Sequence, residues 1–353
     1  MSPAMETRIC RLHGKHDLRV ETIPLVGPAP GEVLVAVGAG GICGSDLHYW
    51  QDGGFGPIRV QEPIILGHEA AGTVVELGAG VIGLGLGDRV ALNPSQPCGT
   101  CAYCREGHRQ HCLSMRFKGS ALRFPHEQGM FRDRIAIGAA QCHVIGAGVT
   151  MAAAACAEPL AVCLRALGRA KERIGAFDGK RVLVTGAGPI GALCAALAAQ
   201  DGAAEVVVTD LQDATLDVAR KMGATATVNV RSSPEELEPW LADKGRIDLT
   251  FECSAAAPAL RQAIAATRPM GTIIQVGVTG DTPIPLNLLV GKEIGLIGTH
   301  RFDHEFAAAV AMINANTLPV DEMVTHTFPL EEAVEAMAAA ADRARSVKVQ
   351  IAF

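Results

Sequence analysis

Four cysteines lie close together in the polar stretch 93–128, with the spacing C-x2-C-x2-C-x7-C. Thiolates this dense suit a single tetrahedral zinc ion, which then has four protein ligands and no open position for substrate. An iron–sulfur cluster is the alternative, because similar spacings hold such clusters in ferredoxins. We predict a structural zinc in a lobe formed by residues 94–115, held by Cys98, Cys101, Cys104 and Cys112.

A second set of potential metal ligands is dispersed along the chain. Cys43 lies in GICGSDLH at a predicted strand-to-helix turn, His68 and Glu69 lie in LGHEAAG, and Glu158 lies in AEPLAV. Taken alone, Cys43 would more often be a small buried hydrophobic residue, and His68 a hydrogen-bonded core histidine. Together, a thiolate, an imidazole and a carboxylate can hold a catalytic zinc and leave room for water or a substrate oxygen.

The glycine-rich run GAGPIG, residues 186–191, follows the strand-like sequence RVLVT and precedes an apolar helix. In this context Gly186 permits a tight turn, Gly188 lets a pyrophosphate approach the backbone, and Gly191 allows close helix packing. Asp210 ends the next strand-like run, EVVVTD, where its carboxylate can bind the adenosine ribose and would repel a 2′-phosphate. We therefore expect NAD as the cofactor, with some use of NADP left open. The alternative is a glycine-rich turn in an unrelated α/β protein.

The elements that would position these residues follow two different sequence patterns. Short β-rich runs with Pro and Gly before residue 93 are typical of antiparallel sheets, whereas the chain from residue 180 alternates apolar strands with helices at about 189 and 214–222, typical of a parallel sheet. A helix over 151–170 is predicted to cross between the domains. The end of the chain is predicted to return to the first domain, with helices over 305–315 and 330–340 and the strand VKVQIAF. The predicted domains are 1–155 with 298–353, and 156–297.

Composition limits the class of protein. Of 353 residues 49% are hydrophobic, but no apolar run is long enough to cross a membrane, and the net charge of −6 argues against nucleic-acid binding. The first residues lack the apolar segment of a secretory signal, so the cytoplasm is expected. Without export, the 11 cysteines are better explained by metal ligation or burial than by disulfides. We expect a soluble protein with a small-molecule partner.

The order of the motifs along nearly the whole chain resembles a known family. GGICGSDLHYW, LGHEAAGTVVELG, GDRVALNP, the cysteine lobe, AEPLAV, GAGPIG and VVVTDL follow one another. The sequence resembles the zinc-containing medium-chain alcohol dehydrogenases, in particular their sorbitol dehydrogenase-like polyol branch. The resemblance implies an α/β fold with a mainly β GroES-like catalytic domain and a doubly wound Rossmann domain, two zinc ions per subunit, hydride transfer between a secondary alcohol and NAD, and a homodimer or homotetramer.

The same resemblance assigns roles to residues near the predicted catalytic metal. Cys43, His68 and Glu69 match its ligands, and Glu158 matches a residue that reaches the metal or its water and contacts substrate. Asp46 is expected to accept the other ring N–H of His68. The remaining catalytic and substrate-binding matches are Ser45 and His48, which would move the alcohol proton toward solvent, and Tyr49 and Arg301, which would contact substrate. Cofactor contacts are expected from Gly186, Gly188, Pro189, Ile190, Gly191, Asp210, Leu211, Val276, Gly277, Val278, Thr299 and Arg301.

Two positions depart from the sorbitol dehydrogenase pattern, because Phe302 replaces a frequent tyrosine and Thr215 an arginine found in some members. The stretches NPSQPCGTC, MRFKGSALRFPHEQGMF, GKEIGLIGTHRF and KVQIAF instead resemble an enzyme of sugar acids. An anionic substrate needs a fixed cation, and arginine can pair bidentately with a carboxylate. We expect oxidation of L-idonate at C5 to 5-ketogluconate, with sorbitol or xylitol as the alternative. The candidate cations are Arg116, Lys118, Arg123, His126 and Arg301, of which Arg116 and Arg301 are predicted to bind substrate.

Two other classes of protein fit parts of the sequence. A regulatory module with a nucleic-acid-binding zinc ribbon would need clustered cations and stacking aromatic residues, and the lobe is only modestly basic. A metal-free quinone reductase would share the fold but would have no use for Cys43, His68 and the cysteine lobe together.

Overall fold

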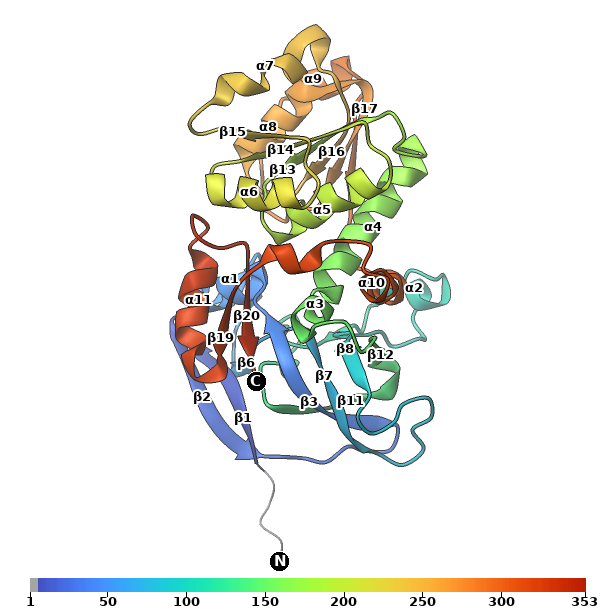
Figure 1. Cartoon of the computed structure of the whole chain (residues 1–353), viewed down its shortest axis with the longest axis vertical. Coiled ribbons are helices and arrows are strands. Elements are labelled where there is room, and N and C mark those ends of the chain that lie inside the picture. Colours follow the sequence, from blue (N-terminus) through green and yellow to red (C-terminus); the bar gives the residue numbers. More distant parts are fainter. Residues whose placement is uncertain (1–5) are drawn as a thin grey trace, which may run out of the picture.

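The computed structural model of the chain describes residues 6–353 (Figure 1). Residues 1–5, which begin the predicted first domain, lie outside the described residues. A mainly β part occupies the lower half of Figure 1 and a parallel sheet with helices occupies the upper half, with the helix α4 (Ala157–Ile174) running between them. Within the described residues, no helix is both long and apolar enough to cross a membrane.

The β part is built around β3 (Glu32–Gly41), whose apolar residues Val33, Val35 and Val37 are buried. Strand β3 pairs with β7 (Glu69–Leu77) on one side and with the last strand, β20 (Lys348–Ala352), on the other, both antiparallel. Gly41 lies opposite both Glu69 and Gln350, so the end of β3 meets the start of β7 and the chain's last strand.

The remaining strands of this part complete three small sheets and one large one. The sheet around β3 runs in the order β12-β8-β7-β3-β20-β19, with β11 also paired to β3, and a second sheet has the order β2-β1-β6. Their bounds are β1 Glu6–Gly14, β2 Asp17–Pro24, β4 Gly54–Phe55, β5 Ile58–Arg59, β6 Ile64–Ile65, β8 Arg89–Leu92, β9 Ser95–Gln96, β10 Arg116–Phe117, β11 Arg134–Gly138, β12 Cys142–Val144 and β19 Val324–Pro329.

The upper part is the predicted parallel sheet, with strand order β15-β14-β13-β16-β17-β18. Counted from β13, this is the 3-2-1-4-5-6 order of dinucleotide-binding sheets. In such sheets the order of the strands reverses at one point, which here lies between β13 and β16. The central residues Val182, Leu183 and Val184 have no exposed surface, as expected for a sheet covered on both faces. The strands are β13 Arg181–Thr185, β14 Glu205–Asp210, β15 Ala226–Asn229, β16 Ile247–Glu252, β17 Thr267–Gln275 and β18 Gly295–Gly298.

The predicted crossover over 151–170 is two helices rather than one. Helix α3 (Met151–Ala155) ends at Cys156, where α4 begins, so the single-helix prediction is wrong at this point. Pro159 lies in the first turn of α4, where its missing N–H costs no helical hydrogen bond. The end of the chain lies against the β part, because β20 joins the sheet of β3 and α11 (Ala333–Ala341) packs on β20 and β2, while α10 (Glu305–Asn314) packs on α4. The predicted domain bounds stay a prediction.

The other helices are short or cover the parallel sheet. They are α1 Gly44–Asp52, α2 Ala102–Arg105, α5 Pro189–Gln200, α6 Asp213–Lys221, α7 Glu238–Leu241, α8 Ala257–Ala266, α9 Leu286–Gly291 and α11 Ala333–Ala341. Single 3₁₀ turns occur at Arg109–His111, Ala139–Gln141, Pro234–Leu237, Ala242–Lys244, Val320–Met323 and Leu330–Glu332.

Candidate active site

The pairing of β3 with β7 brings the three predicted ligands of the catalytic metal together. Cys43 comes two residues after the end of β3 and His68 directly precedes β7, so the opposition of Gly41 and Glu69 places them side by side. The Cys43 sulfur, a ring nitrogen of His68 and a carboxylate oxygen of Glu69 all lie within 4.8 Å of one another. One thiolate, one imidazole and one carboxylate at this spacing fit a zinc ion with an open fourth position.

Glu69 is held by a buried lysine. Both of its carboxylate oxygens accept from Lys348 Nζ, at 2.8 and 2.7 Å, and this amine also donates to the Ile42 carbonyl at 3.0 Å. Burial lowers the pKa of Lys348, but the charges of Glu69 and Cys43 and the hydrogen bond with Glu69 together raise it above its usual value. A Cβ at Gly41 would meet the Glu69 carboxylate, which explains a glycine there.

Asp46 supports the site differently from the prediction. Its carboxylate accepts the backbone N–H of Cys43 at 3.0 Å and that of Gly67 at 3.2 Å. Its nearest oxygen is 3.8 Å from His68 Nδ1, which is too long for the predicted hydrogen bond but close enough for electrostatic attraction. Burial alone lowers the pKa of His68, and the negative charges of Asp46 and Cys43 more than reverse that effect. Asp46 therefore fixes the two turns that carry Cys43 and His68.

Glu158 lies near His68 and Glu69 but does not belong to the group of three ligands. It lies in the first turn of α4 and only 7% of it is exposed. Burial raises the pKa of its carboxyl to about 7, helped by the charge of Glu69 and opposed by the charges of His68, Lys348 and Arg301. A carboxyl with such a pKa can take up or release a proton at neutral pH. Its predicted contact with the metal stays a prediction.

Arg301 lies in the linker between β18 and α10 and is close to Glu158. Its guanidinium carbon lies 4.5 Å from the centre of the Phe117 ring, and that ring lies 5.6 Å from the ring of His68. Burial lowers the pKa of Arg301, while the neighbouring Glu158 and Tyr49 act in the opposite direction. Arg301 thus lies near Glu158 and Tyr49, and the predicted contacts of these three residues with substrate stay predictions.

The two residues of the predicted proton relay lie on α1. His48 is exposed, and its Nδ1 lies 3.0 Å from a carboxylate oxygen of Asp52, while Ser45 is half-buried next to Gly44. No contact between Ser45 and His48 joins them within the described residues, so the relay stays a prediction.

The cations predicted from the 115–131 loop do not converge with Arg301. Arg116 pairs with Glu127 at 2.6 Å, and Arg123 donates to the Ser114 carbonyl. His126 is buried, and its Nε2 accepts the Gln61 N–H. The loop cations therefore stabilise the loop itself. Substrate binding by Arg116 stays a prediction, and a substrate would have to compete with Glu127 for this arginine. Lys118 is half-buried, and burial lowers its pKa.

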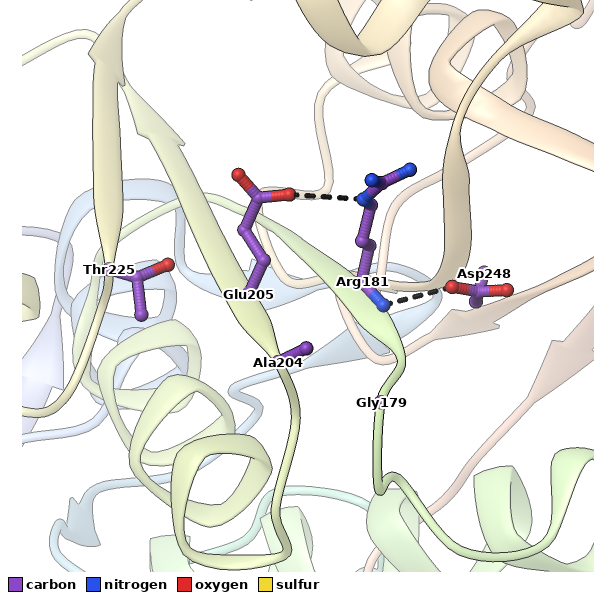
Figure 2. A pocket seen from close by; sticks show the side chains of 6 residues that line it. All are labelled: Gly179, Arg181, Ala204, Glu205, Thr225 and Asp248. Carbon is purple, nitrogen blue, oxygen red and sulfur yellow. Dashed lines mark hydrogen bonds and ion pairs between the residues drawn. The ribbon is translucent and has the colours of Figure 1, made fainter.

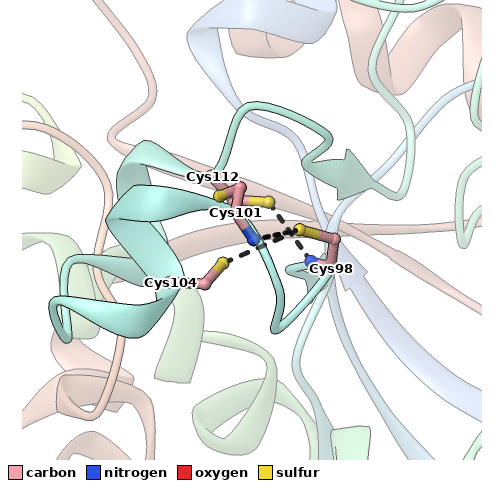
Figure 3. A group of neighbouring side chains, drawn as sticks. All are labelled: Cys98, Cys101, Cys104 and Cys112. Atoms are coloured by element: carbon pink, nitrogen blue, oxygen red, sulfur yellow. Dashed lines mark hydrogen bonds between the residues drawn. The ribbon is translucent and has the colours of Figure 1, made fainter.

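The four cysteines of the lobe converge on one point (Figure 3). All four sulfurs lie within 4.8 Å of one another, and those of Cys98 and Cys104 are 4.0 Å apart. A tetrahedral zinc with Zn–S bonds of about 2.3 Å requires sulfurs about 3.8 Å apart, so the cluster fits a single ion. Backbone N–H groups of Cys98 and Ser114 donate to the Cys112 sulfur and help to fix its position.

The glycine-rich turn after β13 has the features that a pyrophosphate needs. Gly186 has a φ of 87°, which favours glycine, and a Cβ at Gly191 would collide with the Gly186 carbonyl. Gly188 caps α5 and Pro189 and Ile190 form its first turn, so the free N–H groups of the helix face the turn. These backbone features fit a dinucleotide.

Asp210 holds this turn and keeps room for the ribose. Its carboxylate accepts N–H groups of Ala187 at 2.6 Å, Leu211 at 2.7 Å and Gln212 at 3.0 Å. A carboxylate has about four acceptor positions, so about one remains, on the oxygen bonded to Ala187. Thr215 is buried and donates to the Gln212 carbonyl, so it supports the same turn.

The other predicted cofactor residues follow the carboxyl ends of β17 and β18, where ligands of such sheets bind. Val276, Gly277 and Val278 come directly after β17, and Thr299 comes directly after β18. Within the described residues, the buried Thr299 hydroxyl and Gln275 amide oxygen have no hydrogen-bond partner. Two orphaned polar atoms at this edge fit the polar amide of a nicotinamide ring.

Two residues near these sites were not predicted. Lys348 could have been noticed as the one charged residue in the apolar run VKVQIAF. Arg343 lies in the loop between α11 and β20, which rises toward the parallel sheet in Figure 1. One of its guanidinium nitrogens is 3.6 Å from where a Cβ on Gly188 would lie, so a cation of the β part stands at the phosphate-binding turn. A single exposed arginine in a loop gives no sequence signal.

A hollow of about 620 Å³ lies at the opposite edge of the parallel sheet (Figure 2). Its lining includes Arg181 and Glu205, the first residues of β13 and β14, which pair with each other at 3.5 Å. Asp248 accepts the backbone N–H of Arg181 and pairs with Arg268. The hollow lies at the amino ends of the strands, and its charges are already paired, so it is not the cofactor site.

Comparison with known proteins identifies the family. Residues 29–147 match the alcohol dehydrogenase GroES-like domain, and residues 189–315 match the zinc-binding dehydrogenase domain. The chain belongs to the zinc-binding medium-chain dehydrogenases, and within them to the group of polyol and sugar-acid dehydrogenases. It is thus a zinc-dependent alcohol dehydrogenase that uses NAD or NADP, which excludes the predicted alternatives of a regulatory module and a metal-free reductase.

Individual relatives narrow the comparison. The chain is 36% identical to L-idonate 5-dehydrogenase (NAD(P)(+)) of Escherichia coli over 99% of both chains, and the crystal structure of that enzyme superposes with a TM-score of 0.91. It is 38% identical to sorbitol dehydrogenase of Macaca fascicularis over 92% of this chain and 90% of that one. A putative zinc-binding dehydrogenase of Sinorhizobium meliloti bound to NADP, 26% identical over 99% of this chain and 100% of that one, has a TM-score of 0.87.

We expect Cys101→Ser to lower the thermal stability and the yield of folded protein, because structural zinc contributes directly to folding. Zinc analysis of the purified variant should show one ion per subunit where the unaltered enzyme holds two. Cys142→Ser is the control, because Cys142 is half-buried but outside the lobe. Iron in the lobe, or an unchanged metal content in the variant, would contradict the assignment.

We expect Asp210→Ala to weaken the use of NAD and to improve that of NADP relative to it, because the carboxylate would repel a 2′-phosphate. The measurement is the ratio of kcat/KM for the two cofactors. Asp210→Asn controls for damage to the turn, because it keeps an acceptor oxygen for the N–H groups. An unchanged ratio in Asp210→Ala would refute this placement of the ribose.

Proposed function

We propose that the enzyme oxidises a secondary alcohol of a sugar acid with NAD, and that L-idonate, oxidised at C5 to 5-ketogluconate, is its substrate. The observation that carries the proposal is the position of Arg301, a half-buried cation next to Glu158 and stacked on Phe117. A buried guanidinium can bind a carboxylate bidentately while a carbinol of the same substrate lies at the group Cys43, His68 and Glu69.

The protein would divide the chemistry between a few groups. Zinc, when bound, supplies positive charge that favours loss of the alcohol proton, and the nicotinamide accepts the hydride. Cys43, His68 and Glu69 would hold the catalytic ion, with Lys348 fixing the Glu69 carboxylate. Glu158 would contact the reacting alcohol, and Ser45 and His48 would carry its proton to solvent.

Sorbitol or xylitol is the alternative substrate, and the identity of 38% to a sorbitol dehydrogenase supports it. Phe302 argues against it. This side chain is only 1% exposed, and its ring packs on that of Phe306 with the ring centroids 5.6 Å apart. Phe302 has no hydroxyl to offer a polyol, whereas Arg301 next to it offers a permanent charge.

The assembly and the domains are part of the proposal. We place the catalytic domain at residues 1–155 and 298–353 and the NAD-binding domain at 156–297. A homodimer or homotetramer is supported by the edge strand β18, around which Leu286, Leu288, Val290 and Leu296 are exposed. An open strand edge with apolar neighbours is a common site of association between copies of a chain. Eleven free thiols support the cytoplasm as the compartment.

We expect Arg301→Ala to lower kcat/KM for L-idonate by roughly ten- to 150-fold, which corresponds to about 1.5 to 3 kcal/mol for a charged hydrogen-bonded contact. The kcat/KM for sorbitol should change little, because sorbitol carries no carboxylate. Steady-state rates with both substrates, measured on the zinc-loaded enzyme, give the comparison. An unaltered enzyme that turns over sorbitol or xylitol much faster than L-idonate would reject the substrate while leaving the zinc dehydrogenase class intact.

A further inference from the structure

The cysteine lobe and its stem, formed by β9 and β10, touch the linker that carries Arg301. In Figure 1, α2 of the lobe lies beside α10, which follows this linker. The rings of His111 and His300 stack with centroids 5.7 Å apart and an angle of 17°. Arg301 lies over Phe117 of the stem, and Arg109 Nε lies 2.9 Å from a carboxylate oxygen of Asp303. The lobe thus contacts the linker before, at and after Arg301.

The backbone of Arg301 needs such support. Its φ is 48°, in the left-handed region that residues with a Cβ rarely adopt. The linker 299–304 belongs to no helix or strand, so no regular hydrogen-bond ladder fixes it. A conformation of this kind persists only where its surroundings determine it. Phe302, the next residue, is buried and packs on Phe306, which holds the linker from within the core.

The lobe contacts are connected directly to a predicted zinc ligand. Arg109 and His111 lie in one 3₁₀ turn, Arg109–His111, and the next residue is Cys112. Gln110 in the middle of this turn is buried, so the turn has little freedom to shift. Binding of a metal by Cys112 therefore also fixes the groups that meet His300 and Asp303.

We propose that the cysteine lobe positions Arg301 for substrate binding, with Arg109 and His111 as positioning residues. The lobe then does more than stabilise the fold, because it sets the geometry of a charge that substrate must meet. The proposal rests on the proposed function for the role of Arg301 as a substrate-binding group. It applies to a substrate that carries a carboxylate, whichever sugar acid that is.

The expected size of the effect on KM follows from how exposed the ion pair of Arg109 and Asp303 is. The side chain of Arg109 is 51% exposed and that of Asp303 is 14% exposed, so their pair is screened by solvent. We expect Arg109→Ala to raise KM for the best substrate by about threefold, and Arg109→Ala with His111→Ala by about tenfold, a scale typical of weakly buried pairs. The kcat value and the affinity for NADH, measured by fluorescence titration, should stay within about twofold.

Arg105→Ala is the matched control, because Arg105 is an exposed arginine of the same lobe without an ion pair among the described residues. It removes the same charge from the lobe and should leave KM unchanged. The melting temperature and the zinc content of all variants show whether the lobe itself has been damaged. An equal rise in KM in Arg105→Ala and Arg109→Ala would overturn the proposal, because general charge would then explain the effect.

The decisive experiment is a double-mutant cycle between Arg109→Ala and Arg301→Ala, with KM of the best substrate as the readout. If Arg109 acts through Arg301, Arg109→Ala has no further effect once Arg301 is absent. The reciprocal exchange of Arg109→Asp with Asp303→Arg should restore most of the KM. Additive effects of the two alanine variants, or an unchanged KM in Arg109→Ala, would refute the positioning role. Failure of the sugar-acid proposal shows separately, as a preference of the unaltered enzyme for neutral polyols.

Discussion

The ion pair between Glu69 and Lys348 is the contact on which the rest of the site depends. It is almost fully buried, and it connects the start of β7 to the start of the last strand, with β3 between them. Removing one partner of such a pair leaves a buried uncompensated charge, which costs about 3 to 5 kcal/mol. The pair therefore requires the end of the chain to return to the β part. It also holds the Glu69 carboxylate next to Cys43 and His68.

Two loops connect the predicted metal site to the cofactor site. Strand β18 ends the parallel sheet at the edge where Thr299 offers an unpaired hydroxyl, and Arg301 follows two residues later, close to Glu158. In the opposite direction, the loop before β20 carries Arg343 to the phosphate-binding turn, five residues from Lys348 in the sequence. The last segment of the chain thus supplies Arg301 next to the predicted metal ligands and Arg343 at the phosphate-binding turn. Hydride transfer needs this proximity, because its two reactants must meet in one geometry.

Local patterns predicted what depends on local geometry. The turn at 186–191, the thiol cluster and the alternation of the parallel sheet each need residues of fixed type at fixed spacing, and the structure contains all three. Strands β15 and β18 were not predicted, because they are short and half-exposed, and β18 contains two glycines. The break at Cys156 was missed because the run of alanines around it favours helix throughout.

Contacts set by strand register or by loop packing could not be read in this way. The partner of Glu69 comes from residue 348, and only the pairing of β20 with β3 brings the two together. The sequence does not show that Arg116 pairs with Glu127, because only the folded loop brings the two side chains together. Asp46 was expected to bond His68, but the two turns that it holds leave it 3.8 Å away.

The most direct test of the account is crystallography of the zinc-loaded enzyme with NADH, with anomalous diffraction measured on both sides of the zinc edge. The account predicts two zinc peaks, one among the four sulfurs of the lobe and one contacted by Cys43, His68 and Glu69. The second ion should keep one position for an exogenous oxygen, beside the nicotinamide ring. A fully loaded, active crystal with no zinc at the second position, or with Glu69 bound only to Lys348 and no ion beside Cys43, would contradict it.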